Sequence, residues 1–208
     1  MITLLGKAIS RSARCLWALE ETGIAYEHKP VDYTKGEAKT AEFTAINPGA
    51  KIPALTDGEV TMFESLAINL YVAQTYGKGS LWPDDAAGQA QCLQWTLFSA
   101  TEAEPPGSAR LVQFIFKTEE TRSQQVIDDA AERSKAPLNT LETTLQSQPY
   151  LAGDAFTVAD LNVACSIEYL VRTNFDLSPW PMVQDWIARC MDRPAFQAMT
   201  AIKQKEAA

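Results

Sequence analysis

The chain has 208 residues and a formal net charge of −8, with 46% hydrophobic and 21% charged residues. These proportions are ordinary for a globular chain with an apolar core, and no apolar run is long enough to cross a bilayer. The acidic balance and the lack of a Lys/Arg cluster argue against a nucleic-acid binder, and we also expect no membrane partner.

The cysteines and the single histidine narrow the possible chemistry. Cys15, Cys92, Cys165 and Cys190 lie far apart and form no C-x-x-C pair, which argues against a disulfide framework and a zinc cage. His28 is the only histidine, so we expect neither a histidine-based triad nor a metal site. The first residues lack the charged and apolar stretches of a signal peptide, and we therefore expect a cytoplasmic location.

The first third of the chain alternates short β-like runs with helical patterns. The predicted strands lie at residues 2–5, 26–31, 52–55 and 60–62, and the predicted helices at residues 10–21, 38–46 and 64–76. The strand, helix, strand order at the start implies a parallel βαβ unit. Asp57-Gly58 predicts a hairpin turn, so the strands on either side of it should pair in antiparallel fashion.

After Gly77 the β pattern fades and helical periodicity continues almost to the end of the chain. We expect helices at residues 87–103, 110–116, 119–146, 158–172 and 182–191, and from 194 to the tail. Pro105-Pro106 should kink or end the first of these helices, and Pro137 allows a break in the third. The pattern predicts an α/β domain at residues 1–78, a linker at 79–86 and an all-helical domain at 87–208.

The Ile52-Pro53 pair opens a predicted strand and could bind an extended, peptide-like ligand. An X-Pro bond has only a small preference for the trans form. A cis bond would turn the backbone N–H and C=O of Ile52 outward, where a ligand could pair with them like an additional strand. The alternative is an ordinary trans proline on an edge strand.

The predicted helix that begins at Glu64-Ser65 offers a place for the charged end of such a ligand. The unpaired N–H groups and partial positive charge of a helix N-terminus suit a carboxylate, and the Ser65 hydroxyl can add one donor. The Glu64 carboxylate could bind an ammonium group. The alternative is that both residues simply cap the helix.

Ser10-Arg11-Ser12 lies in the turn between the first predicted strand and the first predicted helix. A hydroxyl there could donate a hydrogen bond to a ligand thiolate, and the helix N-terminus would add to the stabilisation. The alternative is that these hydroxyls cap the helix. Cys15 lies a full turn further along, on the apolar face with Leu19, and we expect it in the core.

The order of these motifs is distinctive. S-x-S precedes a helix, N-P-G-A-K-I-P-A-L follows at residues 47–55, and F-E-S-L-A-I-N-L-Y follows at 63–71. In L-A-G-D-A-F-T-V-A-D-L at residues 151–161, Thr157 is the predicted helix N-cap and Asp160 can bond back to it. Together these motifs resemble the cytosolic glutathione S-transferase family over nearly the whole chain, and the S-x-S turn resembles its bacterial-type members with a serine active site.

This resemblance implies an α/β N-terminal thioredoxin-like domain plus an all-α C-terminal helical-bundle domain, the glutathione transferase fold. It also implies a role in detoxification, with glutathione as co-substrate and no metal. The catalytic hydroxyl would belong to Ser10, counted back from Arg14, with Ser12 as the alternative. Redox-type members use a cysteine at the helix start, and the expected burial of Cys15 disfavours that mechanism.

The resemblance also assigns the parts of glutathione to particular residues. The backbone of Ile52, beside Pro53, would pair with the cysteinyl part, while Glu64 and Ser65 would hold the γ-glutamyl amine and carboxylate. Lysine side chains would lie near the glycyl carboxylate. The implied glutathione-binding residues are Lys39, Lys51, Ile52, Pro53, Glu64 and Ser65.

In this family a second, apolar electrophile binds between the two domains, and members usually form homodimers. The candidate pocket residues are Trp95, Phe98, Glu102, Phe114 and Tyr169. The leading hypothesis is therefore an enzyme whose bound glutathione thiolate attacks this electrophile. The alternatives are a non-catalytic ligand-binding or protein-interaction module on the same fold, or a glutathione-dependent peroxidase, disulfide reductase, dehalogenase or isomerase.

Overall fold

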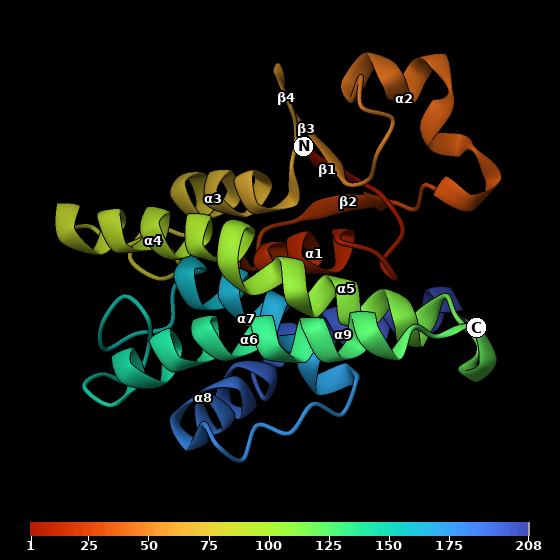
Figure 1. Cartoon of the computed structure of the whole chain (residues 1–208). Coiled ribbons are helices and arrows are strands. Elements are labelled where there is room, and N and C mark those ends of the chain that lie inside the picture. Colours follow the sequence, from red (N-terminus) through yellow and green to blue (C-terminus); the bar gives the residue numbers. More distant parts are fainter. Residues whose placement is uncertain (208) are drawn as a thin grey trace. The chain divides into compact units, whose positions relative to one another are not determined.

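The fold is that of a computed structural model, which describes residues 1–207 (Figure 1). The strands are β1 (Ile2–Leu5), β2 (Tyr26–Lys29), β3 (Ala54–Asp57) and β4 (Val60–Phe63). The helices are α1 (Ser12–Thr22), α2 (Ala41–Ile46), α3 (Ser65–Tyr76), α4 (Ala86–Phe98), α5 (Glu104–Ile115), α6 (Gln124–Leu145), α7 (Val158–Arg172), α8 (Pro181–Met191) and α9 (Pro194–Ala207). The described chain divides into two compact units: Met1–Leu81 with Asp192, Arg193 and α9, and Trp82–Met191.

The first unit is built on a four-stranded sheet with the order β2-β1-β3-β4. β1 and β2 pair in parallel, as the strand, helix, strand pattern predicts, and β3 pairs antiparallel with both β1 and β4. The Asp57-Gly58 turn joins β3 to β4 with Gly58 at a φ of 58°, a conformation that favours glycine. β3 begins at Ala54, two residues later than expected, because Pro53 has no N–H for a sheet ladder.

Helix α1 places most of its side chains in the core of the first unit. Cys15 and Trp17 are both fully buried, which confirms the expected core position of Cys15. The ring of Trp17 meets Phe196 of α9 edge-on, with ring centroids 4.9 Å apart. Arg193, just before α9, donates to both carboxylate oxygens of Glu21 at 2.6 and 2.7 Å. These contacts group α9 with the first unit, whereas the sequence pattern continues the helical domain to residue 208.

The second unit is helical, and α7 forms its centre. Thr157 is the N-cap of α7 and shares a capping box with Asp160, as expected. The buried carboxylate of Asp160 also accepts the Leu151 N–H at 2.8 Å and the Trp186 indole N–H at 2.9 Å. These bonds connect the loop before α7 and helix α8 to one buried side chain, so the motif supports folding rather than catalysis.

The proline pair lies where the expected helix at 87–103 gives way to the next one. A π-helical turn at Ser99–Ala103 leads directly into α5, which carries Pro105 and Pro106 in its first turn. Proline is tolerated there because the first N–H groups of a helix have no partner within it. The predicted helix at 110–116 therefore starts at Glu104, and α6 runs through Pro137 without a break.

Among residues 1–207, no helix is both long and apolar enough to span a bilayer. The same residues contain no cluster of His, Cys, Asp and Glu side chains that could hold a metal ion.

Candidate active site

The loop that leads into β3 contains a cis peptide bond between Ile52 and Pro53. Asn47, which is 3% exposed, holds this loop from the inside. Its Nδ2 donates to the Lys51 carbonyl oxygen at 2.6 Å, and its Oδ1 accepts the Gly49 N–H at 2.9 Å. Ile52 is half-buried and precedes the paired residues of β3, so its backbone lies beyond the end of the sheet ladder.

Gly6, just after β1, is the point where two of the predicted site segments meet. Its φ of +144° is one that residues with a side chain rarely adopt. A Cβ atom on Gly6 would lie 2.2 Å from Ser12 Oγ, 3.1 Å from Ile52 Cβ and 3.3 Å from Pro53 Cα. The Ser12 side chain and the cis bond therefore pack around a space that only glycine leaves open.

The two candidate serines at the start of α1 differ in exposure and in partners. Ser10 is half-buried, and its Oγ donates to the Lys7 carbonyl oxygen at 2.7 Å and accepts the Ser12 N–H at 3.1 Å. Ser12 is fully buried, and its Oγ lies 3.0 Å from Ser10 Oγ. Ser10 is thus the more accessible of the two hydroxyls.

The start of α3 is arranged differently from an ordinary capped helix. Glu64 occupies the N-cap position with φ 70° and ψ 105°, and no side chain caps the helix there. The Glu64 side chain is exposed, while Ser65 is 5% exposed and its carbonyl oxygen accepts the Cys15 thiol at 3.5 Å. The capping alternative for these residues is therefore wrong, and the helix keeps N–H donors at its start.

Both lysines expected near the site are exposed. Lys51 immediately precedes Ile52, and Lys39 ends the short 3₁₀ helix Glu37–Lys39 before α2. Exposed ammonium groups suit a ligand carboxylate that remains in contact with solvent.

The turn that carries Ser10 is held from two sides. Lys7 Nζ lies 2.9 Å from Asp32, and the bonds that Asp32 accepts from Thr34 and Lys7 hold its pKa well below the usual value. On the other side, Glu206 of α9 accepts the Ala8 N–H at 2.7 Å. Residues from distant parts of the chain therefore fix the backbone next to the Ser10 hydroxyl.

His28 of β2 extends this support, since its Nε2 lies 2.8 Å from the Gly6 carbonyl oxygen and its Nδ1 lies 3.4 Å from Glu206. The only histidine of the sequence thus supports the turn that carries Ser10.

The residues expected to bind the electrophile all lie in the second unit. The rings of Trp95 and Phe98 meet edge-on with centroids 5.1 Å apart, and Trp95 is 4% exposed. Phe114 is half-buried and lies under two guanidinium groups, those of Arg110 at 5.0 Å and Arg122 at 4.6 Å from its ring centroid. Two further candidates belong to the same unit: Glu102 is exposed and Tyr169 is half-buried.

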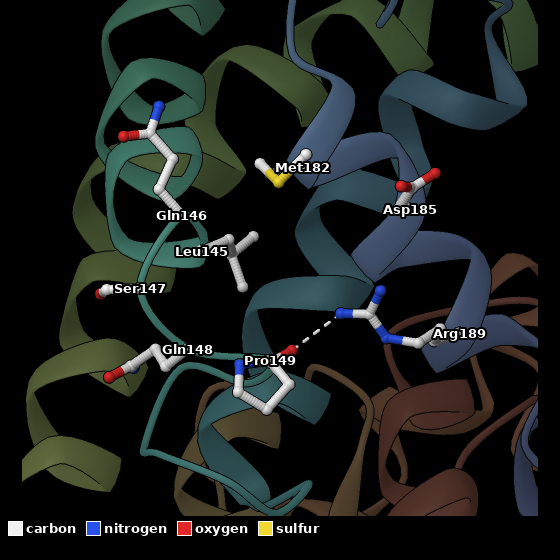
Figure 2. A pocket seen from close by; sticks show the side chains of 8 residues that line it. All are labelled: Leu145, Gln146, Ser147, Gln148, Pro149, Met182, Asp185 and Arg189. Atoms are coloured by element: carbon white, nitrogen blue, oxygen red, sulfur yellow. Dashed lines mark hydrogen bonds between the residues drawn. The ribbon is translucent and has the colours of Figure 1, made fainter.

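A groove of about 350 Å³ opens on another part of the second unit (Figure 2). It lies between the C-terminal end of α6 with the loop that follows it and the helix α8, and Arg189 donates across it to the Pro149 carbonyl oxygen at 2.8 Å. None of the five candidate electrophile residues lines this groove.

Comparison with known proteins identifies the family. The family model for the glutathione S-transferase N-terminal domain matches residues 2–74, and the model for the C-terminal domain matches residues 94–194. A glutathione S-transferase from Hyoscyamus muticus is 33% identical over 213 residues, covering 97% of this chain and 98% of the relative. The chain belongs to the glutathione S-transferase family.

Solved glutathione S-transferase structures confirm the predicted fold. A theta class enzyme from Xanthomonas axonopodis pv. citri with glutathione bound has a TM-score of 0.88 and 29% identity, covering 95% of each chain. Glutathione S-transferase I from maize, in complex with an atrazine glutathione conjugate, has a TM-score of 0.88 and 31% identity, covering 98% of each chain.

Three residues that support the candidate site could not be identified from the sequence pattern. Gly6 and Asn47 act through close packing and loop hydrogen bonds, and the N-P-G motif contained Asn47 without showing its inward-facing role. Glu206 bonds to a residue 198 positions away, for which the local sequence carries no signal.

Proposed function

We propose that this glutathione S-transferase binds reduced glutathione, stabilises its thiolate through the Ser10 hydroxyl and catalyses attack of the thiolate on an apolar electrophile. The observation that carries the proposal is the packing around Gly6, where the Ser12 side chain, bonded to Ser10, meets the cis Ile52-Pro53 bond. The related enzyme with glutathione bound supports the choice of ligand.

Glutathione would lie extended along the loop before β3. Its cysteinyl amide would pair with the backbone of Ile52, which precedes the ladder of β3. The γ-glutamyl carboxylate would accept hydrogen bonds from the start of α3 and from Ser65, where the helix dipole favours negative charge. The exposed Glu64 carboxylate would bind the amine, and Lys51 or Lys39 would lie near the glycyl carboxylate.

Ser10 would be the residue that contacts the sulfur. A thiol in water has a pKa of about 8.5, and a nearby donor at a helix N-terminus lowers this value to about 3.5–7.5. Ser10 is half-buried, and α1 begins two residues after it, so both contributions are available at this position. The thiolate is the nucleophile, and the enzyme contributes positioning and charge stabilisation.

The second substrate would be an apolar electrophile bound against aromatic side chains of the second unit. The maize relative with an atrazine conjugate supports a substrate of this kind. We retain Trp95, Phe98, Glu102, Phe114 and Tyr169 as the proposed contacts. We also propose that the enzyme is a homodimer.

Calorimetry and kinetics test this function together. We expect wild-type protein to bind reduced glutathione and to conjugate it with a dinitrobenzene electrophile. Ser10→Ala should lower the conjugation rate about 10- to 100-fold, because a hydrogen bond to a charged group contributes about 1.5–3 kcal/mol. Glutathione affinity should change much less, since most contacts lie elsewhere.

A folded protein with no measurable affinity for glutathione would contradict the proposal. Glutathione binding without turnover of several electrophiles would instead favour a ligand-binding module. Turnover of peroxides or disulfides without conjugation would favour the reductase alternative.

A further inference from the structure

Ser10 and Ser12 form a hydroxyl pair whose direction can be deduced. The two Oγ atoms are 3.0 Å apart, and Ser10 Oγ also lies 2.7 Å from the Lys7 carbonyl oxygen. A carbonyl oxygen can only accept, so Ser10 gives its single hydroxyl proton to Lys7. Ser12 must therefore be the donor within the pair.

Ser12 supplies a second hydrogen bond to the same atom. Its backbone N–H donates to Ser10 Oγ at 3.1 Å. Ser10 Oγ thus accepts two hydrogen bonds, one from the hydroxyl and one from the amide of Ser12. Hydrogen bonds in a chain polarise one another, so a hydroxyl that accepts two bonds becomes a stronger donor.

The two serines also differ in what they can reach. Ser12 is fully buried, with its Oγ packed against the open face of Gly6. Ser10 is half-buried, so its hydroxyl can leave the Lys7 carbonyl oxygen and donate to a ligand instead. The arrangement therefore favours Ser10 as the donor to the ligand and Ser12 as its support.

We infer that Ser12 is a positioning residue for glutathione activation, an inference that rests on the proposed role of Ser10. Ser12 holds Ser10 Oγ in place and strengthens its hydroxyl as a donor to the glutathione sulfur. The thiol proton leaves to solvent, both serine hydroxyls keep their protons, and neither serine forms a covalent bond to the substrate.

The second unit contains a matched control pair. Ser99 Oγ donates to the Asn162 carbonyl oxygen at 2.9 Å and lies 2.8 Å from Ser166 Oγ, so Ser166 donates to Ser99 by the same reasoning. Ser99 and Ser166 are both fully buried. Ser166→Ala therefore removes an equivalent hydroxyl donor at a position outside the proposed glutathione site.

The test measures the pH midpoint at which bound glutathione becomes a thiolate, by ultraviolet difference absorbance, in wild type and four variants. These are Ser12→Ala, Ser10→Ala, the double variant Ser10→Ala/Ser12→Ala, and Ser166→Ala. We expect Ser12→Ala to raise the midpoint by about 0.7 of a pH unit, because the hydrogen bond from the Ser12 hydroxyl to Ser10 Oγ is lost. At a pH below the midpoint, this shift is a roughly fivefold loss of bound thiolate.

Four further results are expected if Ser12 acts through Ser10. The conjugation rate of Ser12→Ala should return to the wild-type value above its new midpoint, and its affinity for S-methylglutathione should not change. The double variant should match Ser10→Ala, because Ser12 has no second route to the sulfur. Ser166→Ala should keep the wild-type midpoint.

The outcomes separate this inference from the proposed function. A raised midpoint in Ser10→Ala with an unchanged midpoint in Ser12→Ala would overturn the inference alone. Additive effects in the double variant, or a rate loss in Ser12→Ala that is the same at every pH, would also overturn it. A Ser10→Ala variant with the wild-type midpoint would contradict the proposed function itself.

Discussion

Gly6 and Glu64 lie in the candidate site, and both have backbone conformations that residues with a side chain rarely adopt. Their φ values are +144° and 70°, and a residue with a side chain in such a region costs about 1–3 kcal/mol. At Glu64 this cost accompanies the uncapped start of α3, where N–H groups remain available for an anionic ligand. Strain at this point of the chain is therefore consistent with a binding role.

Gly6→Ala should damage both stability and glutathione binding. The new Cβ would meet Ser12 Oγ at 2.2 Å and Ile52 Cβ at 3.1 Å, so the serine and the loop before β3 must both move. We expect a loss of about 3 kcal/mol in the free energy of unfolding, combining overpacking with the unfavourable φ. Urea denaturation and glutathione calorimetry measure the two effects.

Gly23→Ala is the matched control for this change. Gly23 also has a positive φ, of 67°, but a Cβ there would meet no atom within 4 Å. We expect it to cost only about 1 kcal/mol of stability and to leave glutathione affinity unchanged. Wild-type affinity in Gly6→Ala would show that the packing around Gly6 does not hold the site together.

At the scale of elements, one carboxylate ties the β3–β4 hairpin to α3. Asp57 accepts a hydrogen bond from Tyr76 and another from Tyr71 at 2.8 Å. These two bonds lower the pKa of Asp57, and the bond to Asp57 raises the pKa of Tyr76 to about 12. Since α3 begins at the proposed γ-glutamyl site, this connection helps to set where its N–H donors lie.

The double variant Tyr71→Phe/Tyr76→Phe should show a pH-dependent loss of stability. The pKa of Asp57 is lower in the folded protein than in the unfolded chain, so its contribution is complete above the unfolded value of about 3.9 and fades as the pH falls below it. We therefore expect the difference in Tm between wild type and variant to be largest near pH 6 and to shrink near pH 3. A Tm difference that stays constant over this range would contradict the charged role of Asp57.

At the scale of the whole molecule, signals that act within a few residues predicted the structure well. The Asp57-Gly58 turn, the capping box of Thr157 and Asp160, and the βαβ order all act over short distances, and the structure contains each of them. Packing between distant segments was not predictable in this way. The contact of Trp17 with α9 and the bond of Glu206 to Ala8 depend on residues more than 170 positions apart, where no periodicity connects them.

In the candidate site, too, local sequence signals could be interpreted, whereas packing between distant segments could not be predicted. The motifs around Pro53 and Glu64 indicated where a peptide-like ligand could bind, because backbone chemistry at a proline or a helix start is local. The sequence left the choice between Ser10 and Ser12 open, since it depends on which hydroxyl is enclosed. The burial of Ser12 against Gly6 now favours Ser10, and this assignment stays a prediction until the sulfur contact is measured.

The proposed homodimer makes a prediction for the exposed face of α4. Leu93 and Leu97 are 45% and 66% exposed and lie one turn apart, so they form an apolar strip on one side of the helix. We expect this strip to be buried between two copies of the chain. Burying a leucine contributes about 1.5–3 kcal/mol. In a two-fold symmetric dimer each substitution removes two such leucines, one from each copy. Leu97→Glu should therefore raise the dimer Kd at least about a hundredfold.

Light scattering at a series of protein concentrations measures the molecular mass and, from it, the change in the dimer Kd. Val112→Glu is the control, because Val112 is 40% exposed on α5 and lies outside the strip. We expect the control to keep the mass of two chains while Leu97→Glu shifts to the mass of one at micromolar concentration. Because glutathione would bind wholly to residues of the first unit, monomeric Leu97→Glu should still bind it. A Leu97→Glu protein that remains dimeric would show that another surface joins the two copies.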